Sequence, residues 1–334
     1  MKTERIDIIA TTISGSIQDW KKVERIVPLF RDQGFDNVQL HEVDTHKAAR
    51  EKTSQILTEG GRIPISAGGS GTFRNVLEGC IDSGIALSEI RLGFLRKGSA
   101  DLIGKVLDMP DKIEEAVRVF AESIERRSTL PCDVLLAESV EGNVTSIHFV
   151  GYGGAEIFGR IPYYTENRYI KWYKGILSQF FGDLGPFTTG MILSLGERLS
   201  KGPFGGQGRW KIHVDGHDVA EDRYQALIIL NGYLGPELSF TSDPLGSGHF
   251  HLFAMRDIGI RKLPQQATRA RSGKIMEDPE AWGMQSYLIR NCLELSPSKP
   301  KPFPANIDGS TMICHRGLRV RIVDRVPLIS RSGS

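Results

Sequence analysis

Apolar residues in the first part of the chain recur with two alternating periods. Short apolar runs such as RIDIIA (residues 5–10) and VQLHEV (38–43) have the pattern of β-strands. The segments QDWKKVERIVPLF (18–30) and AAREKTSQIL (48–57) repeat apolar residues at the three- and four-residue spacing of amphipathic helices. Strands that alternate with helices predict a parallel sheet, so we expect an α/β domain at this end of the chain.

The same alternation continues through the next two strands. RIPIS (62–66) and IRLGFL (90–95) have the strand pattern, and a glycine-containing turn follows each of them. LIGKVL (102–107) and DKIEEAVRVFAESIERRS (111–128) then have the helical spacing. We therefore predict a first domain over residues 1–130.

Beyond Pro131 the pattern changes to short apolar and aromatic runs that Gly, Asp and Pro interrupt. Turn residues at such short intervals predict an antiparallel, β-sandwich-like second domain over residues 131–322. A helical segment rich in aromatic residues, Tyr169–Leu199, interrupts the strands, and we interpret it as core packing rather than as a lipid-facing flap. The proline-rich segment Ser296–Asn306 predicts an exposed loop.

Composition narrows the class of protein. At 334 residues and 40% hydrophobic content, the chain is long enough for two domains with separate cores. A net charge of +2 gives no reason to expect a nucleic-acid partner, so we expect a small-molecule partner. The four cysteines form no CxxC pair, which argues against a disulfide framework and indicates a reducing compartment. Because no run approaches about 18 apolar residues, we expect a cytoplasmic protein without a membrane span.

The stretch ISAGGSGTFRNVLEG (residues 65–79) places a row of small residues between a strand and a helix. Three interpretations stay open. Backbone N–H groups at a helix start can cradle an anion, which predicts a bound nucleotide phosphate. Ser70 between two glycines is similar to the nucleophile elbow of serine hydrolases, which predicts an acyl-enzyme. The third interpretation is a structural turn without a ligand.

Other short motifs accompany this glycine turn. ATTISG (10–15) follows the first strand, a threonine, Thr45, precedes the second helix, and GSAD (98–101) follows the fourth strand. This order resembles the diacylglycerol kinase catalytic superfamily of bacterial lipid kinases, sphingosine kinases and ceramide kinases, distant relatives of NAD kinases. That family has NPxSG, GGDGT and GTxND or GSTD at these places. The resemblance runs from about Ile6 to about Val323, and it implies a tail, residues 323–334, that returns to the first domain.

The resemblance implies an ATP site with Mg²⁺ as cofactor. Glycines would let the backbone approach phosphates that a Cβ would block, and the hydroxyls of Ser70, Thr72 and Ser99 would add donors. Helix capping is the alternative role for Asp101. The implied nucleotide-binding residues are Ser14, Gly15, Thr45, Gly68, Gly69, Ser70, Gly71, Thr72, Gly98, Ser99 and Asp101.

Several acidic residues of the family are missing. Ser70 replaces the aspartate of GGDGT, Asn75 replaces a helix glutamate, and Ser247-Gly248 replaces an Asp-Gly pair. A serine cannot hold Mg²⁺ as a carboxylate does, so reduced or lost kinase activity is an open alternative. Asp308, in DGS where the family has DGE, matches the aspartate proposed as general base. Its alternative role is that of a turn residue, because Asp-Gly is a common turn pair.

We therefore predict an ATP-dependent lipid kinase that phosphorylates a diacylglycerol- or sphingoid-type hydroxyl in a cleft between the domains. One alternative is a non-catalytic relative that binds nucleotide or lipid, because binding needs the glycines whereas turnover needs the missing acids. Another is a serine acyl hydrolase that uses Ser70. A lipid acceptor, rather than another small hydroxyl compound, predicts peripheral contact with the inner membrane face.

Two histidine pairs remain, His213 with His217 and His249 with His251. Each pair could bring two imidazoles to one face. Neither has the HExxH spacing and no cysteine joins them, so the sequence favours ordinary surface or core histidines over a metal site.

Overall fold

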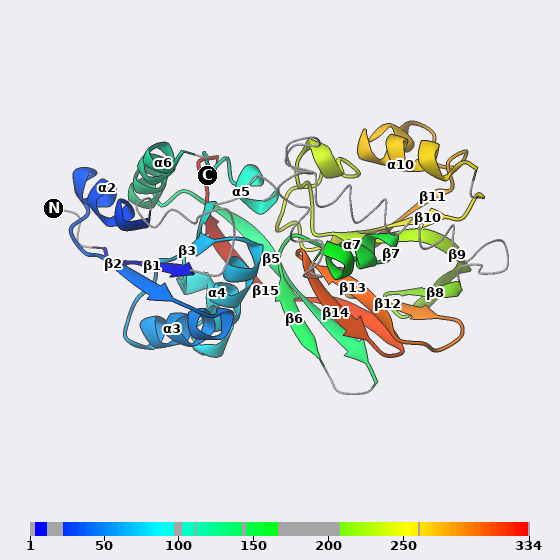
Figure 1. The fold of residues 1–334 in the computed structure, drawn as a ribbon, viewed down its shortest axis with the longest axis horizontal. Helices are drawn as coiled ribbons and strands as arrows, with labels where there is room; N and C mark the ends of the chain where they lie inside the picture. The colour runs from blue at the N-terminus through cyan, green and yellow to red at the C-terminus, as the bar shows by residue number, and fades with distance from the viewer. Residues whose placement is uncertain are drawn as a thin grey trace. The chain divides into compact units, whose positions relative to one another are not determined.

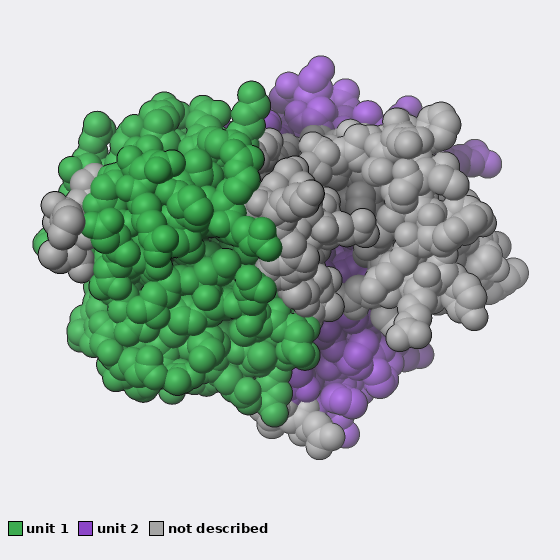
Figure 2. All heavy atoms as spheres, turned by 60° about the vertical axis from the view of Figure 1, so that its left-hand side comes forward, with its two compact units in different colours: residues 1–134, 324–334 green, residues 135–323 purple. Residues whose placement is uncertain are grey.

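The computed structural model describes residues 4–11, 23–96, 102–110, 112–141, 145–165, 208–259 and 261–332. The chain divides into two compact units, which Figure 2 colours green and purple. Unit 1 comprises Met1–Val134 and Asp324–Ser334, and unit 2 comprises Leu135–Val323. The sequence predicted a first domain that ends at residue 130 and a tail that begins at residue 323.

Unit 1 is built on a four-stranded parallel sheet in the order β2-β1-β3-β4. β1 lies in the middle, where Ile8 pairs with Leu40 on one side and with Ile65 on the other. All six residues of β1 are buried, as expected for a strand covered on both faces. The strands are β1 (Ile6–Thr11), β2 (Val38–Val43), β3 (Pro64–Gly68) and β4 (Gly93–Arg96).

Helices cover both faces of this sheet (Figure 1). α3 (His46–Thr58) and α4 (Ser70–Asp82) pack together on one face, and α2 (Ile26–Asp32) and α6 (Ile113–Arg126) pack on the other. The predicted alternation of strands and helices is confirmed. The beginning of its first helix, with Trp20, lies outside the described residues. The short α5 (Leu102–Val106) and the 3-10 helix η1 (Leu87–Glu89) complete the elements of this unit.

The end of the chain belongs to the core of unit 1. β15 (Gly317–Ile329) crosses from unit 2 into unit 1, and Val326, Leu328 and Ile329 are fully buried. Leu92 N donates to Pro327 O and Ile329 N donates to Leu92 O, both over 2.9 Å. The last residues of β15 therefore extend the hydrogen bonding of the strand segment just before β4.

Unit 2 is built mainly from antiparallel strands. In the described residues they follow the order β14-β13-β7-β9-β8-β12-β15-β5-β6, and β10 and β11 join at β9. The strands are β5 (Thr129–Val140), β6 (Ser146–Phe149), β7 (Tyr152–Glu156), β8 (Arg209–Val214), β9 (His217–Leu230), β10 (Phe250–Arg256), β11 (Met284–Ile289), β12 (Cys292–Pro297), β13 (Phe303–Ile307) and β14 (Ser310–Cys314). The helices are α7 (Ile157–Thr165), α10 (Leu263–Arg271), η3 (Pro236–Leu238) and η4 (Lys274–Glu277).

Apolar residues of these strands form a buried core. Trp210 and Tyr224 are fully buried in it, and the Trp210 ring packs edge-on against Phe303 at a centroid distance of 4.7 Å. The indole N–H donates to Glu156 Oε1 over 2.7 Å, so this polar atom is satisfied inside the core. The predicted fold class is confirmed: a parallel α/β sheet at the N-terminal end and a large antiparallel sheet after it.

One local prediction is wrong. Ser296–Asn306 is not an exposed loop throughout, because β13 begins at Phe303 and most of its residues are buried. Proline usually argues against a strand, but Pro304 lies beside β14, and β7 pairs with β13 only at Asn306 and Ile307. The predicted helical segment 169–199 lies outside the described residues.

Candidate functional site

The strand order of unit 1 marks one place where a ligand can bind. The chain passes from β1 to β2 on one side of β1 and then to β3 on its other side. In open α/β sheets, ligands bind at the carboxyl ends of the two strands where the order reverses, which here are β1 and β3. The glycine turn, residues 68–72, follows β3 at this edge.

Five of the predicted nucleotide-binding residues lie outside the described residues. Ser14 and Gly15 follow β1 in the chain, and Gly98, Ser99 and Asp101 follow β4. Their roles stay predictions. The other six, Thr45 and Gly68 to Thr72, follow the carboxyl ends of β2 and β3.

The glycine turn joins β3 to α4 with a single residue. β3 ends at Gly68, α4 begins at Ser70, and Gly69 between them is the N-cap in an extended conformation. As a glycine, this N-cap residue has no side chain that could cap the helix. The first N–H groups of a helix have no carbonyl partner within it, and the helix dipole is positive there, so the turn attracts anions. The predicted strand-to-helix turn is confirmed.

Packing within the chain explains two of the three glycines of the glycine turn. A Cβ on Gly68 would lie 2.3 Å from Thr72 Oγ1, and a Cβ on Gly71 would lie 2.9 Å from Cε1 of His46. Gly69 has a φ of −88°, which any residue adopts. The small residues at 68 and 71 therefore do not by themselves indicate a ligand.

The two threonines of the predicted site also hold the structure together. Thr72 is fully buried, and its Oγ1 lies 2.7 Å from Oγ1 of Thr11, the last residue of β1. This hydrogen bond joins the end of β1 to the first turn of α4, at the point where the strand order reverses. Thr45 is the N-cap of α3 and accepts a hydrogen bond from Ala48 N over 3.0 Å. Their predicted phosphate contacts stay predictions.

Ser70 is exposed and is the first residue of α4. The serine of a nucleophile elbow sits in a strained backbone turn, whereas Ser70 is helical and is not among the described residues with positive φ. Asn75, which replaces the family's glutamate, donates its side-chain amide to Gly71 O over 2.8 Å. This geometry favours the phosphate interpretation of the turn over the hydrolase interpretation.

His46 is a site residue that the sequence analysis did not single out. It is the first residue of α3, and its ring lies against Gly71 in the first turn of α4. Its Nε2 is buried and has no hydrogen-bond partner among the described residues. Burial, and then the charge of Arg74, lower the pKa of His46, so the imidazole is neutral at physiological pH. Its place directly after Thr45 was the available signal in the sequence.

Asp308 lies in unit 2 at the hairpin between β13 and β14. Its carboxylate accepts hydrogen bonds from three consecutive backbone N–H groups, those of Val150, Gly151 and Tyr152, over 3.1, 3.2 and 2.7 Å. The residue is 7% exposed and has a φ of 44°. Asp308 is therefore a turn residue that fastens a neighbouring segment, and its predicted role as a base facing the glycine turn stays a prediction.

A second Asp-Gly hairpin repeats this arrangement. Asp215, between β8 and β9, has a φ of 49° and accepts hydrogen bonds from Arg290 N, Asn291 N and Cys292 N over 3.0, 2.8 and 2.8 Å. Burial alone would raise the pKa of Asp215, but the three backbone hydrogen bonds outweigh burial and lower it. Because the fold uses this Asp-Gly geometry at two hairpins, the geometry at Asp308 has a sufficient structural explanation.

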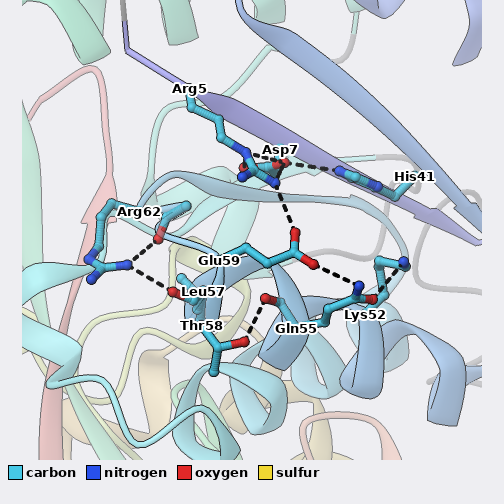
Figure 3. A network of polar contacts seen from close by, with 10 residues as sticks. Arg5, Asp7, His41, Lys52, Gln55, Leu57, Thr58, Glu59 and Arg62 are labelled. Carbon is cyan, nitrogen blue, oxygen red and sulfur yellow. Dashed lines mark hydrogen bonds and ion pairs between the residues drawn. The ribbon is translucent and has the colours of Figure 1, made fainter.

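The opposite edge of the unit 1 sheet carries a buried polar network (Figure 3). Asp7 of β1 is fully buried, and its carboxylate lies 2.9 Å from Nε2 of His41 and within 3.1 Å of the Arg5 guanidinium. Arg5 also reaches Glu59 at the end of α3 over 3.8 Å. The buried Asp7 carboxylate is already paired with Arg5 within the chain, so we assign no ligand to this network.

Comparison with known proteins supports the resemblance in unit 1. Residues 5–134 match the family model of the diacylglycerol kinase catalytic domain. The match begins just before β1 and includes the glycine turn. The expected resemblance is therefore confirmed for this part of the chain. The comparison with curated protein sequences finds no match.

Solved structures share the fold over the whole chain. The crystal structure of a diacylglycerol kinase from Bacillus anthracis str. Sterne is 16% identical, with a TM-score of 0.66, and the alignment covers 99% of this chain and 98% of that one. Two further structures from the same strain are 17% and 18% identical, with TM-scores of 0.68 and 0.69 and the same coverage. Among the described residues, none of the helices has the length and apolar character needed to cross a membrane.

Proposed function

We propose that the chain binds ATP at the glycine turn and transfers its γ-phosphoryl group to a lipid hydroxyl. The observation that carries the proposal is the position of the N-terminus of α4, preceded by the glycine N-cap Gly69, at the point where the strand order reverses, within the residues that match the kinase family model. The N–H groups of the first turn would hold phosphate oxygens, and the exposed hydroxyl of Ser70 would add a donor.

His46 would complete this cradle. Its ring lies against Gly71, and its buried Nε2 has no hydrogen-bond partner in the described part of the chain. A neutral imidazole can donate one N–H, and a phosphate oxygen near Gly71 would satisfy that atom. An arriving phosphate would also stabilise the protonated imidazole, which gives the proposal a direct spectroscopic test.

The residues of the glycine turn suit a phosphate group better than they suit Mg²⁺. The first turn of α4 has no acidic residue, and Ser70 stands where the family has its aspartate. Mg²⁺ prefers carboxylate and phosphate oxygens in octahedral geometry. The described residues of the turn therefore do not supply a metal site, and Mg²⁺ would reach the protein bound to the nucleotide.

The second candidate is a relative that binds nucleotide or lipid and transfers nothing. It is favoured by Asp308, whose two carboxylate oxygens already accept three backbone N–H groups. A general base needs a lone pair directed at the acceptor hydroxyl. In this second candidate function the glycine turn still binds ATP, but no carboxylate is available to accept the proton of the acceptor hydroxyl.

For the acceptor, we propose a lipid hydroxyl of diacylglycerol or sphingoid type, in keeping with the diacylglycerol kinase to which the fold is similar. Such an acceptor resides in a membrane, so a cytoplasmic enzyme would meet it by peripheral contact at the inner membrane face. Another small hydroxyl compound would need no such contact. Transfer to lipid presented in vesicles rather than to a soluble alcohol separates these two acceptors.

The test begins with isothermal titration of ATP with and without Mg²⁺, on the wild type and on Gly69→Val. Gly69 is the informative position because its backbone suits any residue, whereas Cβ atoms at Gly68 and Gly71 would clash with Thr72 and His46. Gly208→Val is the matched control, since a Cβ there comes no closer than 3.6 Å to Lys301. We expect ATP binding to be lost in Gly69→Val and kept in Gly208→Val.

Transfer is measured with labelled ATP and a panel of lipids. Transfer by the wild type supports the kinase, and ATP binding without transfer supports the second candidate. We expect Ser70→Asp to raise Mg²⁺-dependent transfer, because it restores a carboxylate at the turn. ATP binding by Gly69→Val as tight as in the wild type would remove the turn from the site. Labelling of Ser70 by a fluorophosphonate would instead establish the hydrolase.

A further inference from the structure

Three potential metal ligands come together in unit 2. Oδ2 of Asp243 lies 2.8 Å from Nε2 of His249 and 2.8 Å from Nε2 of His251. One ligand atom from each of these side chains lies within 4.8 Å of the other two. In the described part of the chain, this is the one group of His, Cys, Asp or Glu side chains with such spacing.

The strand explains why both imidazoles face the same carboxylate. His249 directly precedes β10, and His251 is its second residue. Alternate residues of an extended chain point to the same side, and Phe250 between them is fully buried in the core. The two imidazole rings lie 5.3 Å apart, centroid to centroid, at 82° to each other. Both nitrogen atoms are thereby directed at one point beside the sheet.

The loop before β10 fixes the carboxylate. Asp243 N donates to Thr241 Oγ1 over 3.1 Å, and Asp243 O accepts from Tyr233 N over 2.7 Å. A Cβ on Gly232 would lie 3.0 Å from Asp243 O, so a glycine is needed there for the two segments to approach. The acid is therefore held in place by the backbone and not only by the histidines.

Apolar packing fixes the inner histidine and leaves the cluster open to solvent. The ring of His251 stacks on Phe253 at 5.8 Å, and Phe253 packs against Phe240 at 5.2 Å. The side chains of His251, His249 and Asp243 are 12%, 22% and 38% exposed. All three side chains are therefore partly exposed, Asp243 most and His251 least.

We propose that Asp243, His249 and His251 form a binding site for a divalent cation of the zinc class, with a remaining coordination position open to water. Two imidazole nitrogens and one carboxylate oxygen are a donor set that Zn²⁺ accepts, whereas Mg²⁺ prefers oxygen alone. The proposal concerns unit 2 by itself and does not depend on nucleotide binding at the glycine turn.

A bound cation would require all three ligand atoms, including the two Nε2 atoms that now lie within 4.8 Å of each other, to take one common spacing. Zinc bonds of about 2.0–2.2 Å in tetrahedral geometry place the ligand atoms roughly 3.3 Å apart. The carboxylate oxygen would move away from each nitrogen by about half an ångström. Each ring would carry its proton on Nδ1 and present the Nε2 lone pair, so two coordinate bonds replace the two hydrogen bonds. The bound cation would tie the loop that carries Asp243 to the start of β10.

The experiment uses the full chain, stripped of metal by a chelator and free of nucleotide. Titration with Zn²⁺ is expected to show one site per chain, and titration with Mg²⁺ none there. Asp243→Asn and His249→Ala should each weaken Zn²⁺ binding by about tenfold or more. His213→Ala is the matched control, because His213 in unit 2 lies 3.1 Å from the exposed Asp218 and does not belong to the proposed site.

A Co²⁺-substituted wild type gives a readout that does not need the variants to fold. A visible spectrum of low-coordinate Co²⁺, with X-ray absorption showing nitrogen and oxygen neighbours, is the expected result. Sulfur neighbours would place the ion at a cysteine and overturn the proposal. So would an unchanged affinity in folded Asp243→Asn, or the absence of saturable Zn²⁺ binding by the wild type.

Discussion

At the scale of single residues, the chain uses the same chemical group for different purposes. Asp215 and Asp308 fasten three backbone N–H groups each, while Asp243 receives two imidazoles. The sequence offers no distinction between them beyond the Asp-Gly pairs. What separates them is the set of donors that the fold brings to each carboxylate.

A comparison of Asp308→Asn with Asp215→Asn tests whether Asp308 is structural or catalytic. An amide turns one oxygen into a donor that faces a backbone N–H, so each variant should lose about 1–3 kcal/mol of unfolding free energy. Urea unfolding measures this loss. If both variants lose similar stability and phosphoryl transfer survives in Asp308→Asn, the role of Asp308 is structural. A selective loss of transfer with unchanged stability would restore the general base.

The pKa of His46 gives a second test. Because folding lowers this pKa below its ordinary value, the unfolded chain binds the proton more readily. The folded state therefore loses stability as pH falls through the ordinary pKa toward the lowered one. In His46→Gln, the loss of stability that comes from protonation of His46 should be absent. Thermal unfolding between about pH 8 and about pH 5 measures it, with His217→Gln, at an exposed position, as the control.

ATP should act in the opposite direction on the same imidazole. A phosphate beside Gly71 favours the protonated ring, so ATP should raise the pKa of His46 toward or above its ordinary value. An NMR titration of the histidine signals with and without ATP follows the change residue by residue. If ATP binds while the His46 signal titrates as before, the phosphates lie elsewhere.

At the scale of elements, the start of α4 combines a packing role with a binding role. Gly68 and Thr72 fit against each other, and Thr72 is hydrogen-bonded to Thr11 at the end of β1. Gly68→Ala should therefore destabilise unit 1 by about 1–3 kcal/mol, because the added methyl group has no room. Gly69→Ala, with its ordinary backbone angles, should change stability by under about 0.5 kcal/mol. Guanidinium unfolding of the two variants, measured side by side, checks the difference.

The spacing of apolar residues along the sequence was sufficient to predict most of the helices and strands, but not all of them. The alternation of apolar residues predicted β1, β2 and the helices between the strands, because each has one face or both faces in the core. β13 escaped prediction because Pro304 and the prolines that precede the strand are typical of a loop, whereas its pairing with β14 and β7 makes it a strand. The glycine turn was predicted because its residues are contiguous. Asp243 was not joined to His249 and His251, since their meeting depends on the loop conformation.

At the scale of the whole molecule, the ends of the sequence meet within one unit. Residues 324–334 belong with residues 1–134, so unit 1 cannot be completed until the rest of the chain has been made. Contacts of such large sequence separation slow folding, because the long loop must close before they form. Unit 2, by contrast, is a continuous segment of the chain.

Deletion of residues 324–334 should therefore damage unit 1 although every residue of the glycine turn remains. The deletion removes the fully buried side chains of Val326, Leu328 and Ile329 and the backbone hydrogen bonds to Leu92. Loss of a single buried leucine costs about 2–5 kcal/mol, so loss of the strand end should exceed the stability of a typical domain of this size. Leu328→Ala should lower the unfolding temperature of unit 1 without abolishing its fold. The matched control ends the chain after Ser332 and keeps all of these contacts. Calorimetry of the three proteins measures the effect, and a truncated chain with an unchanged unit 1 transition would contradict it.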